Sequence, residues 1–443
     1  MTRFLFASIP IEGHSASPLS IMDRLLSTGH DVTWLSGAAY AGRAARLGVR
    51  HVPLDRWTDL SSFDDPFDAF PHLRGLRGAK LIRTGFRDVF VAEAAGQLHD
   101  IEAALEDFPA DVIVADGLVF GARLAAERHG IPYAGIGDGP YAITDPEVPP
   151  FGPGLRRWPG AVGRLRNRAL YAVSRRFFAD VNAELTRVRV EHGFPREHPW
   201  VFDEMAAGDL YLQGSVPGFE YPIEHLPANV RFVGALRPPI PSDWVPPRWW
   251  RDLDGSWPVV HVTQGTIRPD PTELLLPTME ALADEDVLVV ATTGGCDPSE
   301  LGPLPPNARA ESFIPYELLL ARASAFVTNG GFIGTNLALH HGVPVIQVGR
   351  TEEKAEIGAR IEHAGVGLRF GRRPSARRLR DAVHYVLTDR TVRANVEQLS
   401  EQYQLHDAPT EAAALLVELA SARGRAQDFA AAQDIAERST LPA

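Results

Sequence analysis

The sequence has a single cysteine, Cys296, among its 443 residues. One thiol excludes a disulfide framework and any metal site built from several thiolates, and it is typical of a reducing compartment. Long apolar runs are also lacking, since no stretch approaches the roughly 18–20 residues that cross a bilayer. The apolar run at 4–9 leads directly into a helical pattern without a small-residue cleavage site, which favours a core strand over a signal peptide. We therefore expect a soluble, cytoplasmic protein without stable membrane insertion.

The chain has no excess of basic residues. Lys and Arg number 44 against 56 Asp and Glu, which gives a formal net charge of −12. An acidic chain without a basic tract is a poor partner for nucleic acid or an anionic membrane. Hydrophobic residues make up 45% of the sequence, which excludes a disordered or fibrous chain. The length indicates two or three domains.

Short apolar runs alternate with helical patterns along nearly the whole chain. This alternation predicts strand–helix–strand units and parallel sheets with helices on both faces. The predicted strands are 4–9, 32–35, 112–115, 133–136, 259–262, 287–290, 325–328 and 345–348. Prolines crowd the region between them at 216–257, where no regular element is expected because proline fixes φ and lacks an amide donor.

The sequence therefore predicts two doubly wound α/β domains, at 1–215 and 258–410, joined by a proline-rich connection at 216–257 and followed by a helical tail at 411–443. Ligands of open parallel sheets bind at the carboxyl ends of the strands. With two such sheets, we expect the site in a cleft between the domains.

A glycine-rich turn follows the predicted strand that ends at Thr328. Gly330, Gly331 and Gly334 lie between this strand and a helical pattern. Glycines let backbone amides approach an anion, and a helix N-terminus adds partial positive charge, so the geometry suits a diphosphate. The spacing matches neither the dinucleotide fingerprint nor the Walker pattern. Glycines that serve only a tight turn remain an alternative.

Several stretches carry a recognisable pattern, in order and over nearly the whole chain. They are Gly13-His14 followed by Pro18, Gly29-His30-Asp31-Val32-Thr33, Val262-Thr263-Gln264-Gly265-Thr266, Phe313-Ile314-Pro315, Phe326-Val327-Thr328-Asn329-Gly330-Gly331-Phe332, and Gly342-Val343-Pro344. In these stretches the sequence resembles family 1 glycosyltransferases, with the bacterial macrolide and natural-product branch most similar. The resemblance implies a GT-B fold of two Rossmann-like domains and an inverting enzyme that uses a nucleotide-sugar donor.

The resemblance assigns a catalytic base and its partner. His14 falls where the family keeps its base, and a neutral imidazole that titrates near 6.5 is suited to take a proton at pH 7. Asp116, at the end of the strand 112–115, matches the carboxylate that orients this base. An aspartate at this place also serves as a helix N-cap, and that alternative stays open.

The resemblance places donor binding mainly in the second domain. The implied residues are Gly13, Thr266, Phe313, Ile314, Asn329, Gly330, Gly331, Gly334, Thr335, Glu353 and Lys354. Phe313 would stack on the nucleotide base, with core packing as the alternative, and Ile314 would offer backbone hydrogen bonds.

The sequence departs from the family pattern at three of these places. Asn329 replaces the usual His, and Glu353-Lys354 replace the usual Asp-Gln pair that binds sugar hydroxyls. Leu337 replaces a ribose-binding carboxylate, which leaves donor identity open. An exposed first helical turn is the alternative for Glu353 and Lys354.

The acceptor is expected on the first domain. Its candidate contacts are Phe63, Phe67, Phe86 and Tyr141, in loops beside the base, and they suggest a hydrophobic acceptor. Ordinary core aromatics are the alternative, and Phe86 and Phe90 have the spacing of one helix face.

The expected reaction transfers a sugar from a UDP- or dTDP-sugar to an acceptor hydroxyl by a single displacement. We expect no cofactor and no metal, because backbone amides would neutralise the leaving diphosphate. His340 and His341 are sequence neighbours that would not share a helix face, which argues against a metal site there. The alternatives are a non-catalytic binding relative and a nucleotide-sugar epimerase. A homodimer is left open.

Overall fold

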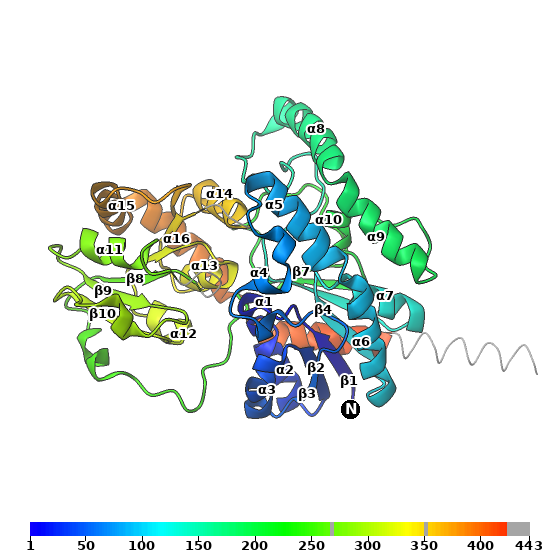
Figure 1. Ribbon diagram of the computed structural model, residues 1–443. Helices are drawn as coiled ribbons and strands as arrows, with labels where there is room; N and C mark the ends of the chain where they lie inside the picture. Colours follow the sequence, from blue (N-terminus) through cyan, green and yellow to red (C-terminus); the bar gives the residue numbers. More distant parts are fainter. Residues whose placement is uncertain (266–269, 350–352, 423–443) are drawn as a thin grey trace, which may run out of the picture.

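The computed structural model describes residues 1–265, 270–349 and 353–422. Within them the chain forms two α/β domains, each built on a parallel sheet (Figure 1). The N-terminal domain lies on the right in Figure 1 and the C-terminal domain on the left. The predicted fold of two doubly wound domains is confirmed.

The N-terminal sheet has the strand order β3-β2-β1-β4-β5-β6-β7 with parallel pairing. Because the order reverses between β1 and β4, their carboxyl ends form a topological switch point, where ligands of such sheets bind. The strands are β1 Arg3–Ala7, β2 Asp31–Ser36, β3 Arg50–Pro53, β4 Val112–Asp116, β5 Tyr133–Gly137, β6 Leu210–Gln213 and β7 Val230–Phe232.

Strand β1 shows why this sheet is covered on both faces. Phe4 and Phe6 pack into one apolar cluster, whereas Leu5 and Ala7 pack into another on the opposite face. Alternate side chains of a strand point to opposite faces, so a run of consecutive apolar residues needs helices on both sides.

Helices of the N-terminal domain fall into two layers around this sheet (Figure 1). Cluster residues from α6, α7 and α9 cover the face of Leu5, and those from α2 and α3 cover the face of Phe4. The helices are α1 Glu12–Ala16, α2 Leu19–Ser27, α3 Ala41–Leu47, α4 Pro66–Ala69, α5 Gly78–Gly85, α6 Ala94–Asp107, α7 Phe120–His129, α8 Gly160–Phe177, α9 Ala179–Glu191 and α10 Val201–Glu204, with the π-helix η4 at Phe86–Val91 and short 3-10 turns η1 Ala38–Tyr40, η2 Leu60–Ser62 and η3 Pro71–Leu73.

The C-terminal sheet repeats the same topology in the order β10-β9-β8-β11-β12-β13. Its switch point therefore lies between the carboxyl ends of β8 and β11. The strands are β8 Val259–Thr263, β9 Leu288–Thr292, β10 Ala308–Glu311, β11 Ala325–Thr328, β12 Val345–Val348 and β13 Gly367–Phe370. The helices are α11 Leu275–Ala281, α12 Tyr316–Leu320, α13 Phe332–His340, α14 Lys354–Ala364, α15 Ala376–Thr388 and α16 Arg390–Gln404, with 3-10 turns η5 Arg248–Asp252 and η6 Pro298–Leu301.

The proline-rich segment 216–257 differs from its prediction as a connection without regular elements. Strand β7 lies inside it and pairs with β6, so the N-terminal sheet extends beyond residue 215. Val216 and Phe219 pack into the core of the C-terminal domain. The segment thus contributes to both domains, because strand pairing and apolar burial are available between its prolines.

The tail returns to the domain where the chain began. A helix at 408–422 follows α16, and it lies along the N-terminal domain in Figure 1. Ala412 and Leu416 of this helix pack into the same cluster as Phe4 and Phe6. The tail therefore ties the end of the described chain to the first strand.

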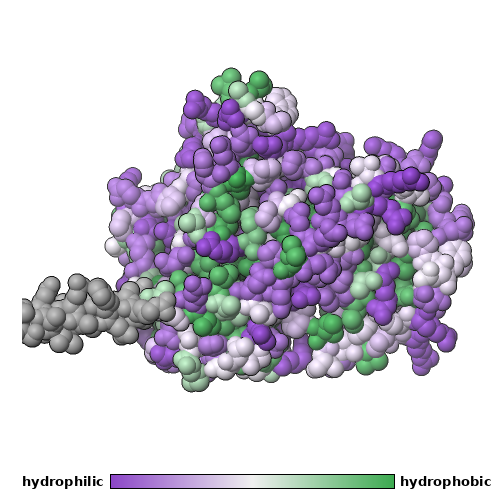
Figure 2. All heavy atoms as spheres, turned by 180° about the vertical axis from the view of Figure 1, so that it is seen from behind, coloured by the Kyte–Doolittle hydropathy of each residue, from purple (hydrophilic) through white to green (hydrophobic). Residues whose placement is uncertain are grey.

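Most of the surface seen in Figure 2 is hydrophilic, and a small green group caps its top, over α8. The exposed apolar side chains of α8 are Val162, Leu165 and Val173. In the described part of the chain, no helix combines the length and apolarity that a bilayer crossing requires.

Candidate active site

The first switch point carries an imidazole between two carboxylates. His14 lies on α1, directly after β1, while Asp116 ends β4 and Asp138 follows β5. His14 Nδ1 contacts Asp116 Oδ2 and lies 3.2 Å from Asp138 Oδ2. The two carboxylates are 4% and 7% exposed, whereas the imidazole is 25% exposed. Both acceptors face the same ring nitrogen, so Nδ1 carries the proton and the neutral ring keeps a lone pair on Nε2.

The charges around His14 change its acidity. Burial acts to lower the pKa of His14, but the charges and hydrogen bonds of Asp116 and Asp138 outweigh burial and raise it well above its ordinary value. Burial together with the charge of Asp116 raises the pKa of Asp138 to about 6, against the opposing effect of His14. The sequence predicted an imidazole that titrates near 6.5, and the structure differs because two carboxylates surround the ring instead of one.

Asp116 uses both of its carboxylate oxygens, one toward His14 and one toward the backbone that follows β4. Its Oδ2 contacts His14, while Oδ1 accepts a hydrogen bond of 2.7 Å from the Leu118 amide. Helix α7 begins later, at Phe120, so Asp116 stabilises the turn ahead of the helix rather than capping the helix itself. The hydrogen bond from the Leu118 amide holds the Asp116 carboxylate in the position where it contacts His14.

Among the described residues, the second switch point presents amide groups. The Asn329 side-chain amide, after β11, donates to the Gln264 carbonyl after β8 and joins the two strand ends. Gly330 has a φ of +96°, and a Cβ there would lie 2.6 Å from Gln347 Cγ. Only glycine fits this turn without strain or a shift of Gln347. Helix α13 begins directly after this turn.

Helix α13 presents its first-turn amides at this point. Amides of the first turn have no acceptor within a helix, so they remain for an anion. The Thr335 amide, by contrast, donates to the Gly331 carbonyl, and its side chain is fully buried. A Cβ on Gly334 would approach Tyr316 at 3.0 Å, so this glycine serves close packing as well. Gly331, also predicted to contact the diphosphate, has open space around a Cβ built on it.

The two switch points lie near one another across the domain boundary. Ile333, in the first turn of α13, packs against the N-terminal apolar cluster that contains Ala16. Ala16 is two residues beyond His14 on α1. Figure 1 shows α1 and α13 side by side at the middle of the molecule. The base candidate and the amide cluster therefore belong to one region.

The nucleotide-base candidates sit in the loop between β10 and α12. Phe313 is 57% exposed, which suits a stacking surface and disagrees with the core alternative. Ile314 is fully buried in an apolar cluster, so its side chain serves the core. The remaining donor candidates lie at the ends of helices. Gly13 is exposed on α1, and Glu353 and buried Lys354 stand at the start of α14. Thr266 lies outside the described residues.

Comparison with known proteins decides the family. Residues 276–419 match the model of the erythromycin biosynthesis protein CIII-like C-terminal domain. The 4'-demethylrebeccamycin synthase of Lentzea aerocolonigenes is 43% identical over 94% of this chain and 98% of its own length. The chain belongs to the family 1 glycosyltransferases, on their natural-product branch.

Solved structures of glycosyltransferases share the fold. The kitacinnamycin glycotransferase superimposes with a TM-score of 0.72 at 22% identity, covering 94% of this chain and 99% of its own. The spinosyn rhamnosyltransferase SpnG has been solved with thymidine diphosphate, with a TM-score of 0.66, 19% identity and coverage of 95% and 100%. SpnG has also been solved with the spinosyn aglycone.

The acceptor candidates of this glycosyltransferase are spread over different environments. Phe63 is 40% exposed and Phe67 is partly buried. Phe86 lies in the π-helix η4 and packs against Phe202 at 5.1 Å between ring centroids, so its ring serves the core at least in part. Tyr141 is buried at 3% exposure, and its hydroxyl is buried without a hydrogen-bond partner in the described chain.

Asp138 is the functional candidate that the sequence did not single out. It follows a buried apolar strand, as Asp116 does, and this shared position was the available signal. The prediction needed the strand order, since only the adjacency of β1, β4 and β5 brings both carboxylates to His14. Ser17 adds a hydroxyl that donates to Asp138 over 3.1 Å.

The expected absence of a metal at His340 and His341 stays a prediction, although its argument from helix faces does not hold for these two residues. Their ring nitrogens and a Glu317 carboxylate oxygen all lie within 4.8 Å of one another. His341 is the C-cap of α13 and departs from helical geometry, so the helix-face argument does not apply to it. Arg237 donates to Glu317 over 3.3 Å and provides this carboxylate with a cationic partner.

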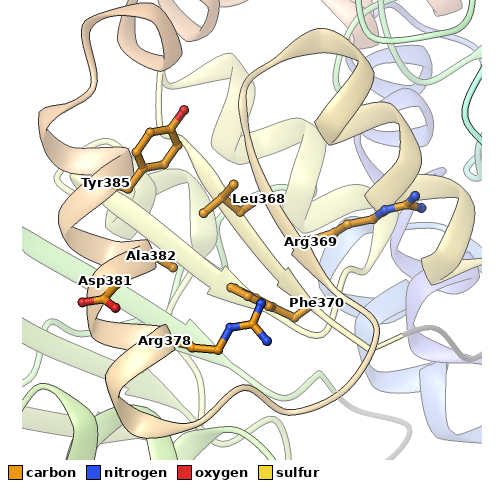
Figure 3. A pocket seen from close by; sticks show the side chains of 7 residues that line it. All are labelled: Leu368, Arg369, Phe370, Arg378, Asp381, Ala382 and Tyr385. Carbon is orange, nitrogen blue, oxygen red and sulfur yellow. The ribbon is translucent and has the colours of Figure 1, made fainter.

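Figure 3 shows a surface hollow of about 360 Å³ between β13 and α15. It is lined by Leu368, Arg369, Phe370, Arg378, Asp381, Ala382 and Tyr385. None of the described candidate site residues is among them.

Proposed function

We propose that this glycosyltransferase moves a sugar from a nucleoside diphosphate sugar, with UDP or dTDP as the nucleotide, to a hydroxyl of a hydrophobic natural-product acceptor. The observation that carries the proposal is the imidazole of His14 held by Asp116 and Asp138 beside the amide-rich end of α13. An imidazole held by a carboxylate is a general base, and amides at a helix N-terminus are a diphosphate site.

The chemistry is a single displacement with inversion. His14 Nε2 removes the proton from the acceptor hydroxyl as its oxygen forms a bond to the anomeric carbon. The bond from that carbon to the diphosphate oxygen breaks, and the nucleoside diphosphate leaves with the electron pair. First-turn amides of α13, with the turn at Gly330, stabilise the charge that grows on the leaving group. The proposal requires neither a metal ion nor an organic cofactor.

Relatives support the classes of donor and acceptor. SpnG, which shares the fold, binds thymidine diphosphate and an aglycone, and the relative from Lentzea aerocolonigenes is a rebeccamycin-type synthase. In this chain Phe313 is an exposed aromatic surface for a pyrimidine ring. Glu353 and Lys354, at the start of α14, are proposed to bind sugar hydroxyls.

The test is direct. The purified protein is incubated with UDP-glucose and a set of dTDP-deoxysugars against a panel of aromatic and macrocyclic acceptors, and products are identified by mass spectrometry. We expect a glycoside together with stoichiometric release of the nucleoside diphosphate. Nucleotide binding by calorimetry without product across the whole panel would instead favour a non-catalytic binding protein.

A further inference from the structure

A buried ion cluster crosses the domain boundary next to the proposed sugar-binding end of α14. Arg360, on α14, is 1% exposed. Its Nε contacts Glu220, and its Nη1 donates to Glu356 over 3.0 Å. Glu220 and Glu356 are as deeply buried. Burial acts to lower the pKa of Arg360, and the two glutamates outweigh it and raise that pKa above its ordinary value. Buried charges are stable only when they are paired in good geometry. The three side chains of this cluster must therefore keep their relative positions.

Arg360 also reaches the loop that follows Asp138. Its Nη2 donates to the Tyr141 carbonyl over 2.9 Å, and the Tyr141 amide donates to Glu220 over 3.3 Å. The cluster therefore holds both backbone groups of a residue only three positions beyond Asp138. Asp138 in turn contacts His14.

The same loop is bound to the first turn of α14 further along. Glu356 Oε1 accepts hydrogen bonds of 2.9 Å from the Gly152 amide and 2.7 Å from the Gly154 amide. Gly154 has a φ of +60°, and a Cβ there would lie 2.1 Å from the Ala355 carbonyl oxygen. Backbone thus contacts backbone at a point where no larger residue fits.

Arg369 adds a second connection between the domains. It donates to the Gly154 carbonyl over 2.9 Å, and Figure 3 shows its side chain pointing away from the hollow. Glu356 is three residues beyond Glu353, one helical turn from the proposed sugar ligands. The loop 138–154 is therefore fixed to the base at one end and to the sugar-binding helix at the other.

We propose that Arg360 is a positioning residue that sets the distance between the base and the donor sugar across the domain boundary. The inference rests on the proposed function and assigns a residue that does not touch the substrate. Displacement of reacting groups by about 1 Å can lower a rate by about 10²-fold, so a rigid tie between the two halves of the site affects turnover. The proposed nucleotide contacts, at Phe313 and the start of α13, lie on other elements, so we expect nucleotide affinity to be independent of the tie.

The experiment compares two variants that disturb the tie by different means. Arg360→Lys keeps the charge but loses the fork that binds two glutamates and a carbonyl. Gly154→Ala leaves every charge in place and forces the loop off α14. We expect each to lower kcat about 10²-fold, with the dissociation constant for the nucleoside diphosphate unchanged. The stoichiometry of nucleoside diphosphate binding, measured by calorimetry, gives the number of folded binding sites. The value of kcat is then expressed per folded site.

Two controls match these variants. Gly160→Ala introduces a side chain at a φ of +77° with open space around it, so it carries the same backbone strain without the obstruction. Arg237→Lys alters another arginine that pairs with acidic groups near the domain boundary, Glu317 and Asp407. Both controls are expected to retain the wild-type kcat.

The outcomes separate the two proposals. If the wild type transfers sugar and both Arg360→Lys and Gly154→Ala keep the wild-type kcat per site, the positioning role is overturned. The proposed function is then unaffected. Absence of transfer by the wild type with every donor overturns the proposed function and this inference with it. If Arg360→Lys does not fold, Gly154→Ala against Gly160→Ala decides the question.

Discussion

The two switch points of this protein share a strand order but carry opposite chemistry. At the N-terminal one, His14 is held by Asp116 and Asp138, so the site is titratable and anionic. At the C-terminal one, the described residues Asn329 and Gly330 shape a turn that presents amide groups. The comparison teaches that one topology serves two tasks, because the side chains at the strand ends, rather than the sheet, decide the chemistry.

The division follows from the proposed reaction. Accepting a proton requires a group whose charge can change, which glycine-rich backbone cannot supply. Holding a leaving diphosphate requires donors that do not repel it, which two buried carboxylates cannot supply. Each switch point therefore has what the other lacks, and variants at one should spare the task of the other.

The largest expected effect comes from removing the base. We expect His14→Ala to lower kcat by about 10²–10⁴-fold, because a general base contributes about that much. The dissociation constant for dTDP or UDP should not change, since the proposed nucleotide contacts at Phe313 and α13 lie in the other domain. Steady-state kinetics with calorimetry measure both quantities. His129→Ala, an exposed histidine on α7, is the matched control, and undiminished transfer in His14→Ala would refute the assignment of the base.

The complementary variant is Phe313→Ala in the C-terminal domain. Base–aromatic stacking contributes about 1–3 kcal/mol, so we expect nucleotide affinity to fall about 5–150-fold. The value of kcat at saturating donor should be retained, because the base is untouched. Trp257→Ala removes another exposed aromatic ring from the same half of the chain and serves as control. Equal affinities in Phe313→Ala and wild type would show that the ring is not part of the site.

A smaller, qualitative effect is expected from Asp138→Asn. The charge of Asp138 helps to raise the pKa of His14, and a base must lose its proton before it acts. In the wild type, kcat/KM should therefore rise with pH through the raised pKa of the cluster. Removing one negative charge lowers the pKa of His14, so the acid limb of the profile should move to lower pH. A limb that stays in place would exclude Asp138 from the titrating cluster.

The sequence predicted the repeating fold well because buried parallel strands read as short apolar runs. It also paired His14 with Asp116 through a family pattern, and the two side chains are in contact in the structure. It did not assign Asp138, whose role depends on the order of strands in space. Nor did it indicate Arg360, because a charged residue in a helical pattern reads as solvent-facing until its partners from the other domain are known.

Two candidate ligand contacts make internal contacts in the structure that the sequence did not indicate. Thr335 was expected to contact a diphosphate, but its amide bonds to the preceding turn and its side chain is buried. Phe86 was expected to contact the acceptor, and its ring packs against Phe202. Both residues lie near the predicted sites in sequence, and burial depends on neighbours that are distant along the chain.

The anomeric configuration of the product tests the central claim most directly. If a base in one domain and a leaving-group site in the other act on opposite sides of a single sugar, the transfer must invert the anomeric carbon. Proton NMR of the isolated glycoside, compared with the donor, measures this through the coupling at that carbon. We predict inversion, and a product that retains the configuration of the donor would contradict the account.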